Sequence, residues 1–286
     1  MKICAVIFNY NLPYETNEIY NKLLSDGFDR NNILVVDNGS EANLKPSCAN
    51  FILPKNIRFT GQSFITSTLL LEYYDYDCFI FLTTSAKLVD NINYFSEVNK
   101  CADLMKKENL GFIAASLFGG RTEDSAPEQN VTLLKKEFTP VYNYQPIATL
   151  ISRNLLVKCK ENNSAYFNLD LIRGWGIDRE LQFTANEHGM KCYISKSLVV
   201  EWATNLAHKK GVADESVNKY RTESEFEMVS VMTKKYGINW SNKFLNKFNE
   251  VNGIKDYYSN NKVWLSYILI KLKLFKPLKQ FMNQKW

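Results

Sequence analysis

Short apolar runs alternate with helix-like segments along the first part of this 286-residue chain. The strand-like runs are 3–8, 33–36, 51–53, 78–82 and 111–116, and the helix-like segments are 14–25, 63–74 and 93–107. An uninterrupted apolar run is typical of a parallel strand covered on both faces, because neither set of alternating side chains meets water. The pattern therefore predicts an α/β fold with a mostly parallel sheet and helices on both faces.

The second part of the chain is less regular. After a polar stretch over 119–144, the expected strands are 145–152, 192–194 and 198–202, the expected helices are 175–188 and 222–236, and 240–260 is polar and mixed. We interpret residues 1–215 as the sheet domain and residues 216–286 as a helical C-terminal extension.

Composition excludes several classes of protein. Hydrophobic residues make up 45% of the chain and charged residues 23%, which excludes wholesale disorder and a multi-span membrane protein. The six cysteines form no CxxC pair and have no histidine at ligand spacing, so we expect free thiols in a reducing cytosol and no zinc site. Met1 and Lys2 lead straight into an apolar run too short for a signal peptide, so we expect a cytoplasmic protein.

Positive charge is concentrated at the C-terminal end. The formal net charge is +5, yet residues 262–286 hold six lysines and no acidic residue, leaving 29 basic and 30 acidic residues elsewhere. The neutral body argues against a nucleic-acid partner. The apolar run 263–275 is too short to span a bilayer, and we interpret the tail as an interfacial helix on an anionic membrane. A helix docked on the fold, or a dimer contact, is the alternative.

Polar clusters follow three of the expected strands. They are Asn9-Tyr10-Asn11, Asp37-Asn38-Gly39-Ser40 and Thr83-Thr84-Ser85. In open α/β sheets, ligands bind beyond the carboxyl ends of the strands, where Asp37 could accept hydrogen bonds from a ribose or base. The same residues also suit a plain turn. A dinucleotide-binding GxGxxG after the first strand and a phosphate-binding GxxxxGK[ST] are both missing from the sequence.

A second candidate segment runs from Arg173 to Leu181 and contains Gly174-Trp175-Gly176-Ile177-Asp178. Trp175 offers a stacking face between two glycines, and Asp178 lies at the start of a helix, where the dipole favours its charged form. Such a carboxylate suits general-base activation of a sugar hydroxyl. The alternative is a helix cap beside a core tryptophan. Of the two histidines, His188 is explained by a helix end, and a structural role is the commoner one for His208.

The order of these segments resembles the GT-A glycosyltransferases of the inverting family 2 type, over roughly residues 1–205. The resemblance implies a nucleotide-sugar donor, with Asp178 as catalytic base and Trp175 and Gly176 as acceptor contacts. The implied donor-binding residues are Phe8, Asn9, Tyr10, Asp37, Asn38, Arg58, Gly61, Thr83, Thr84 and Ser85. It also implies that 1–215 is the catalytic domain and that the acceptor is a hydroxyl of a glycan or lipid-linked molecule, in surface polysaccharide synthesis.

The chain departs from the family at two points. The family's DxD motif, which holds a divalent metal against the diphosphate, is replaced by Thr83-Thr84-Ser85, and Ile177 stands where an acid is common. We therefore predict no metal ligands in this turn, with Mg²⁺ or Mn²⁺ left open as a cofactor, and name Arg58 and Lys87 as candidates to neutralise the diphosphate. A non-catalytic nucleotide- or glycan-binding module on the same fold is the alternative function.

Overall fold

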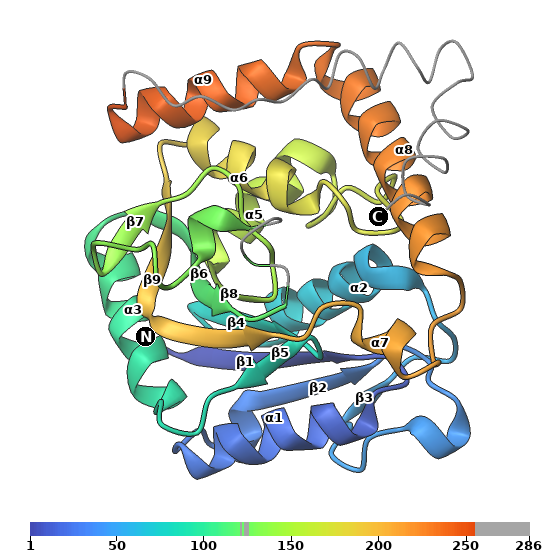
Figure 1. Cartoon of the computed structure of the whole chain (residues 1–286). Coiled ribbons are helices and arrows are strands. Elements are labelled where there is room, and N and C mark those ends of the chain that lie inside the picture. Colours follow the sequence, from blue (N-terminus) through green and yellow to red (C-terminus); the bar gives the residue numbers. More distant parts are fainter. Residues whose placement is uncertain (121, 123–125, 255–286) are drawn as a thin grey trace.

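The computed structural model describes residues 1–120, 122 and 126–254 (Figure 1). Their strands form one nine-stranded sheet in the order β3-β2-β1-β4-β8-β6-β9-β5, with β7 paired to β9. The strands are β1 (Ile3–Asn9), β2 (Ile33–Asp37), β3 (Phe51–Ile52), β4 (Cys78–Thr83), β5 (Ala86–Leu88), β6 (Leu110–Phe118), β7 (Phe138–Pro140), β8 (Ala148–Ser152) and β9 (Lys191–Trp202). The helices are α1 (Pro13–Ser25), α2 (Arg58–Tyr73), α3 (Tyr94–Lys107), α5 (Arg153–Asn163), α6 (Ile177–Glu187), α7 (Leu206–Lys209), α8 (Val217–Tyr236) and α9 (Trp240–Asn252).

Most strands of the sheet run in one direction. β3, β2, β1 and β4 are parallel to one another, and β6 is parallel to β9. β8 lies between β4 and β6 and is antiparallel to both, so these two groups share one direction. Only β8 and the short strands β5 and β7 run the other way within the described sheet. The predicted mostly parallel sheet is confirmed.

The sheet separates two hydrophobic cores, and β1 shows why its sequence is apolar throughout. Ile3, Ala5 and Ile7 belong to one core, whereas the intervening Cys4, Val6 and Phe8 belong to the other. Successive side chains of a strand point to opposite faces, so a strand covered on both faces needs apolar residues at every position.

Helices cover both faces, as the sequence predicts (Figure 1). Buried side chains of α1 and α3 pack in the first core, and buried side chains of α2, α5 and α6 pack in the second. Buried residues of α8 and α9 also belong to the second core, so the described part of the C-terminal extension shares a core with residues 1–215. The basic tail 262–286 lies outside the described residues.

Several elements differ from the expected ones. The two strands expected over 192–194 and 198–202 form one bulged strand, β9. Ser195 and Ser197 interrupt its apolar pattern, and both hydrogen bond to Glu137. Helix α9 lies in the stretch described from the sequence as polar and mixed, because its large buried side chains are few and spaced four residues apart, at Trp240, Phe244 and Phe248. The helix α5 and the short strands β5 and β7 were not predicted.

Helix α2 begins at Arg58, five residues before the expected start, so Arg58 and Gly61 lie in a helix rather than in a loop. The polar sequence from Pro54 to Gly61 has the composition of a turn. In the structure the Ile57 side chain packs closely on Gly61, so that a Cβ added to Gly61 would lie 3.1 Å from it. Among the described helices, none is both long enough and apolar enough to cross a membrane.

Candidate active site

The polar ends of β1, β2 and β4 lie side by side at one edge of the sheet. Asn9 at the end of β1 pairs in register with Asp37 of β2, and Phe8 pairs with Thr83 of β4. The Nδ2 of Asn9 donates to Asp37 Oδ1 at 2.6 Å and to Ser40 Oγ at 3.1 Å. The structure thus brings the three predicted polar clusters to the same edge.

Asp37 is fully buried, and its carboxylate is bound by neighbouring side chains. Besides Asn9, the hydroxyl of Ser40 donates to Asp37 Oδ1 at 2.5 Å and the Ser40 backbone N–H donates to Oδ2 at 3.1 Å. Gly39 lies between them at φ +70°, and a Cβ there would come within 2.2 Å of the Lys55 carbonyl carbon. Asp37 therefore fixes a turn that is packed tightly against the next loop.

Asn38 ties this turn to the start of α2. Its side chain donates to Asn56 Oδ1 at 3.0 Å and to the Arg58 carbonyl at 3.3 Å, and it accepts the Ile57 N–H at 3.0 Å. Arg58 adopts a left-handed conformation with φ +63°, and its N–H donates to Asn56 Oδ1 at 2.8 Å. Two asparagine side chains thus hold a conformation that a non-glycine residue rarely adopts.

Other residues predicted for the donor site lie in the core or in turns. Phe8 is buried in edge-to-face contact with Phe59 and Phe81, at ring distances of 5.7 and 5.1 Å. Thr83 binds the Ile147 carbonyl through its N–H at 3.0 Å. Thr84 and Ser85 follow as a partly buried turn, and the Ser85 carbonyl accepts the Ala203 N–H at 2.9 Å.

Asp178 lies in the first turn of α6, as expected, with its side chain 17% exposed. Burial raises its pKa above the ordinary value of an aspartate, although Arg179 and backbone N–H groups of the helix start oppose the shift. The Arg179 Nε lies 3.7 Å from Asp178 Oδ2. A carboxylate whose pKa is raised is a better proton acceptor when ionised, which suits a general base.

In the segment before α6, Arg173 and Trp175 both contact Tyr220 of α8. Trp175 lies edge-on to Tyr220 of α8, with ring centroids 6.4 Å apart. The Arg173 guanidinium lies over the Tyr220 ring at 5.9 Å. Gly176 adopts φ +92° as the helix cap, and a Cβ there would come within 2.8 Å of Met228. α8 therefore packs directly on the predicted acceptor segment.

Residues 203–216, which we call the strap, connect β9 to α8. The strap crosses the carboxyl ends of the parallel strands (Figure 1). The strap was not singled out from the sequence. Its Asp214 accepts a hydrogen bond from Tyr10 Oη at 2.6 Å and one from Asn56 Nδ2 at 3.0 Å. Its Glu215 pairs with Arg173. Nothing in the local sequence around Asp214 and Glu215 indicates that these two acids contact residues far away in the chain.

The turn after β4 lacks the carboxylates that usually hold a divalent metal. The turn after β4 offers only hydroxyl groups, and the part of the chain that the structure describes contains no group of three or more His, Cys, Asp or Glu side chains able to hold a metal ion. Mg²⁺ and Mn²⁺ require carboxylate oxygens or similar hard ligands. His208, for which a structural role was expected, lies in ring contact with Tyr220, with centroids 6.2 Å apart.

Two grooves lie away from the strand ends. One, of about 660 Å³, lies between α6 and α9 and is lined by residues including Phe183, Asn239 and Lys243. The other, of about 440 Å³, lies at the amino end of α5 and is lined by residues including Asp77, Leu110 and Arg153. The polar strand ends, over which the strap lies, are a separate place from both.

Two solved structures that contain nucleotide-sugars share the architecture of this chain. S. aureus TarS 1-349 in complex with UDP-GlcNAc is 15% identical in sequence, with a TM-score of 0.55 over 92% of this chain and 78% of that chain. The mannosyltransferase PcManGT from Pyrobaculum calidifontis, in complex with GDP-Man and Mn²⁺, is 12% identical, with a TM-score of 0.52 over 99% of this chain and 83% of that chain. No protein-family model and no curated protein matches the sequence.

The chain has a GT-A fold. At these identities the likeness establishes the fold, and the activity has to be argued from the site. The structure brings the strand-end residues Asn9, Tyr10, Asp37, Asn38 and Arg58 close together. Of the other residues predicted for the donor site, Phe8 lies in the core and Gly61 lies within α2.

Proposed function

We propose that this protein is a glycosyltransferase that moves a sugar from a nucleotide-sugar donor to a hydroxyl of its acceptor. The observation that carries the proposal is the meeting of the polar ends of β1 and β2 with Arg58, at the edge of a GT-A sheet where ligands of open α/β sheets bind. The nucleotide-sugar complexes of TarS and PcManGT, which have this fold, support the same reaction class.

The reaction we propose is a direct displacement with inversion. The acceptor oxygen attacks the anomeric carbon, the bond from that carbon to the diphosphate oxygen breaks, and the nucleoside diphosphate leaves with the bonding electrons. The acceptor proton passes to Asp178, whose pKa is raised by burial and which therefore holds a proton more readily than an exposed aspartate. Trp175 and Gly176 would contact the acceptor.

For the donor-binding residues, we assign roles according to how far each side chain is exposed to solvent. Asp37 and Asn9 are buried and would position the nucleotide-binding turn rather than lie open to solvent, whereas Tyr10 and Arg58 are partly exposed. Thr83, Thr84 and Ser85 would contact the diphosphate or the sugar through hydroxyl and backbone groups. Asn38, which connects the first two loops, would set their separation.

We further propose that the acceptor is a glycan or lipid-linked molecule of surface polysaccharide synthesis. The basic tail 262–286 would hold the enzyme at the anionic cytoplasmic face of a membrane, where such an acceptor is available. The alternative function, a binding module without catalysis, is favoured by one observation: the turn at Thr83-Thr84-Ser85 lacks the carboxylates expected of a metal-dependent transferase.

A panel of UDP-, GDP- and other nucleotide-sugars, tested with the full-length protein, distinguishes these functions. A ligand that binds the native state raises the melting temperature, so the donor is found by thermal shift. We expect one donor to stabilise the protein and to be consumed, with release of its nucleoside diphosphate in the presence of a glycan acceptor. Stabilisation without consumption by any acceptor preparation would favour the binding module. No stabilisation by any member of the panel would contradict both the transferase and a module that binds nucleotides.

A further inference from the structure

Four side chains from three segments of the chain converge on two adjacent carboxylates of the strap. Tyr10 Oη, at the end of β1, donates to Asp214 Oδ1 at 2.6 Å, and Asn56 Nδ2 donates to Asp214 Oδ2 at 3.0 Å. The Arg58 Nη1 lies 3.4 Å from Asp214 Oδ2 and 3.8 Å from Glu215 Oε1. The Arg173 guanidinium binds both oxygens of Glu215.

The two arginines meet at a single oxygen. Glu215 Oε1 is within ion-pair distance of both the Arg58 and the Arg173 guanidinium groups, which belong to residues 115 positions apart in the sequence. Burial is the largest single effect on Glu215 and opposes its ionisation, but the hydrogen bond from Arg173 and the positive charges of Arg173, Arg58 and Lys219 together outweigh burial and lower the pKa of Glu215 below its ordinary value. The side chain of Glu215 is only 10% exposed. Without the strap, two converging guanidinium groups would be left without these anions.

We propose that Asp214 and Glu215 occupy the place of the donor's diphosphate, and that Tyr10, Asn56, Arg58 and Arg173 bind this diphosphate once the strap moves away. This inference rests on the proposed function. Two adjacent carboxylates present closely spaced anionic oxygens, as a diphosphate does, and the forked guanidinium group binds either kind of oxygen in pairs. The arginines would thereby neutralise the charge of the diphosphate. A metal held by the turn after β4 would otherwise do this, but that turn has no carboxylates.

The strap is held in a way that permits this exchange. None of its residues belongs to the hydrophobic part of the buried core, in the portion of the chain that the structure describes. Its contacts are mainly polar: Lys210 pairs with Glu15 of α1, and the Val212 carbonyl accepts from Asn11 Nδ2 at 3.4 Å. Segments with few buried apolar contacts open at low free-energy cost. Lys87, the other predicted diphosphate ligand, pairs instead with Glu201 of β9 at 3.0 Å.

Calorimetric titration of inorganic pyrophosphate, and separately of UDP and GDP, in a buffer with chelator tests this inference. Glu215→Gln and Asp214→Asn keep shape but remove the competing charge, so each should bind pyrophosphate about tenfold more tightly than the wild type, because the competent state becomes more populated. Arg173→Gln should bind it more weakly. Glu250→Gln, which removes the partner of Lys247 on α9, is the matched control and should leave affinity unchanged.

Amide hydrogen exchange on the wild-type protein gives a second readout that needs no variant. Exchange within 206–216 should rise when pyrophosphate is added, because the anion displaces the strap. Equal affinities for the wild type and both acid variants, or binding that requires a divalent ion, would overturn the inference even if donor turnover is found. Tighter pyrophosphate binding by the acid variants would support it even if no nucleotide-sugar is consumed, and only the proposed glycosyl transfer would then fail.

Discussion

At the residue scale, polar side chains near the strand ends fall into two groups. Asn9, Asp37 and Ser40 are buried and bind one another, so their role is to hold the shape of the turn. Arg58 and Asp214 are each 37% exposed and bind partners that can exchange. Burial therefore distinguishes the residues that build the site from those available to a ligand, which the sequence alone could not do.

Replacing Asp37 tests the first role. In Asp37→Ala the donors of Asn9 and Ser40 lose a charged acceptor in a buried place, so we expect the free energy of unfolding to fall by about 3 kcal/mol. Chemical denaturation measures this. Asp103→Ala, at an exposed position of α3, is the control and should stay within about 0.5 kcal/mol of the wild type. A stability of Asp37→Ala equal to that of the control would show that the network does not hold the turn.

Asp178 gives a prediction with a definite pH dependence. Burial is the main reason that its pKa is raised in the folded state. The folded protein therefore loses stability as the pH rises above the ordinary aspartate value of about 4, because the buried carboxyl group then has to ionise. Asp178→Asn removes this cost, and its melting temperature at pH 7 should exceed that of the wild type. The difference should disappear at a pH well below 4, where both side chains are neutral. A lower melting temperature at pH 7 would indicate a stabilising helix cap.

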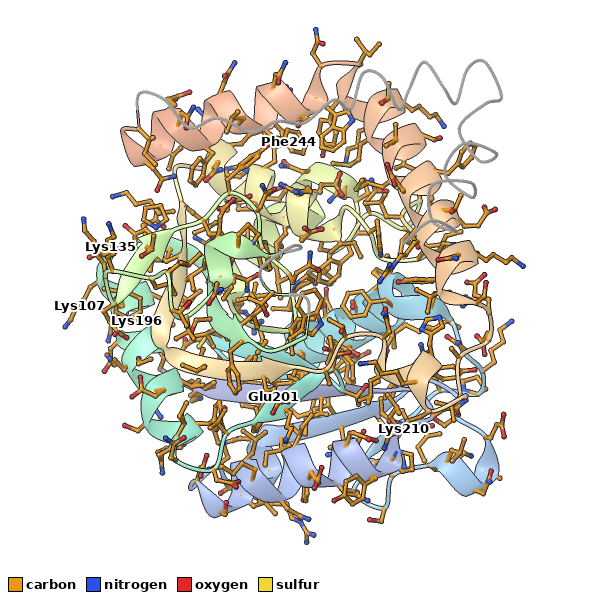
Figure 2. The ribbon with its side chains drawn as sticks, viewed as in Figure 1. Lys107, Lys135, Lys196, Glu201, Lys210 and Phe244 are labelled. Atoms are coloured by element: carbon orange, nitrogen blue, oxygen red, sulfur yellow. The ribbon has the colours of Figure 1, made fainter. Side chains whose placement is uncertain are left out.

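At the scale of elements, aromatic contacts anchor the helical extension, and Phe244 makes a stacked one. Phe244 of α9 lies parallel to Phe183 of α6 with ring centroids 3.9 Å apart, and Figure 2 shows it on the side of α9 that faces the rest of the molecule. Trp240 and Phe248 extend the same face by one turn on either side. The remaining positions of the helix are mostly polar, which explains why the sequence did not predict it.

Shortening Phe244 tests this packing. Phe244→Ala removes a side chain that is 2% exposed and should lower the free energy of unfolding by about 3–5 kcal/mol. Asn246→Ala, at an exposed position of the same helix, should change it by no more than about 0.5 kcal/mol. Equal denaturation midpoints for the two variants would mean that α9 is not docked on α6.

At the scale of the whole molecule, the sequence predicted the parallel strands well where a strand is covered on both faces and apolar along nearly its whole length, as in β1 and β4. It also predicted which strand ends meet, since parallel strands share one carboxyl edge. It could not predict that Asp214 reaches Tyr10, a contact across 204 positions that depends on tertiary packing. It did not predict that α2 starts at Arg58, because the residues before Gly61 have the composition of a turn. The conformation of Arg58 depends on hydrogen bonds with the side chains of Asn38 and Asn56.

The basic tail is a property of the whole molecule, because the rest of the chain carries nearly balanced charge. We expect a protein lacking residues 262–286 to bind vesicles containing anionic lipid much less than the full chain does, in a cosedimentation assay at low salt. Added salt should reduce the binding of the full chain, because charge attraction is screened over about 10 Å at 0.1 M. Equal sedimentation of the two proteins would contradict membrane binding by the tail.

The catalytic role of Asp178 is the central claim, and the rate of nucleoside diphosphate release from the stabilising donor tests it most directly. Asp178→Asn keeps the shape of the side chain but cannot accept a proton at neutral pH, so kcat should fall by about 10²–10⁴-fold while the affinity for the donor stays unchanged. Full turnover by Asp178→Asn, with the wild-type donor affinity, would contradict the assignment of Asp178 as the base.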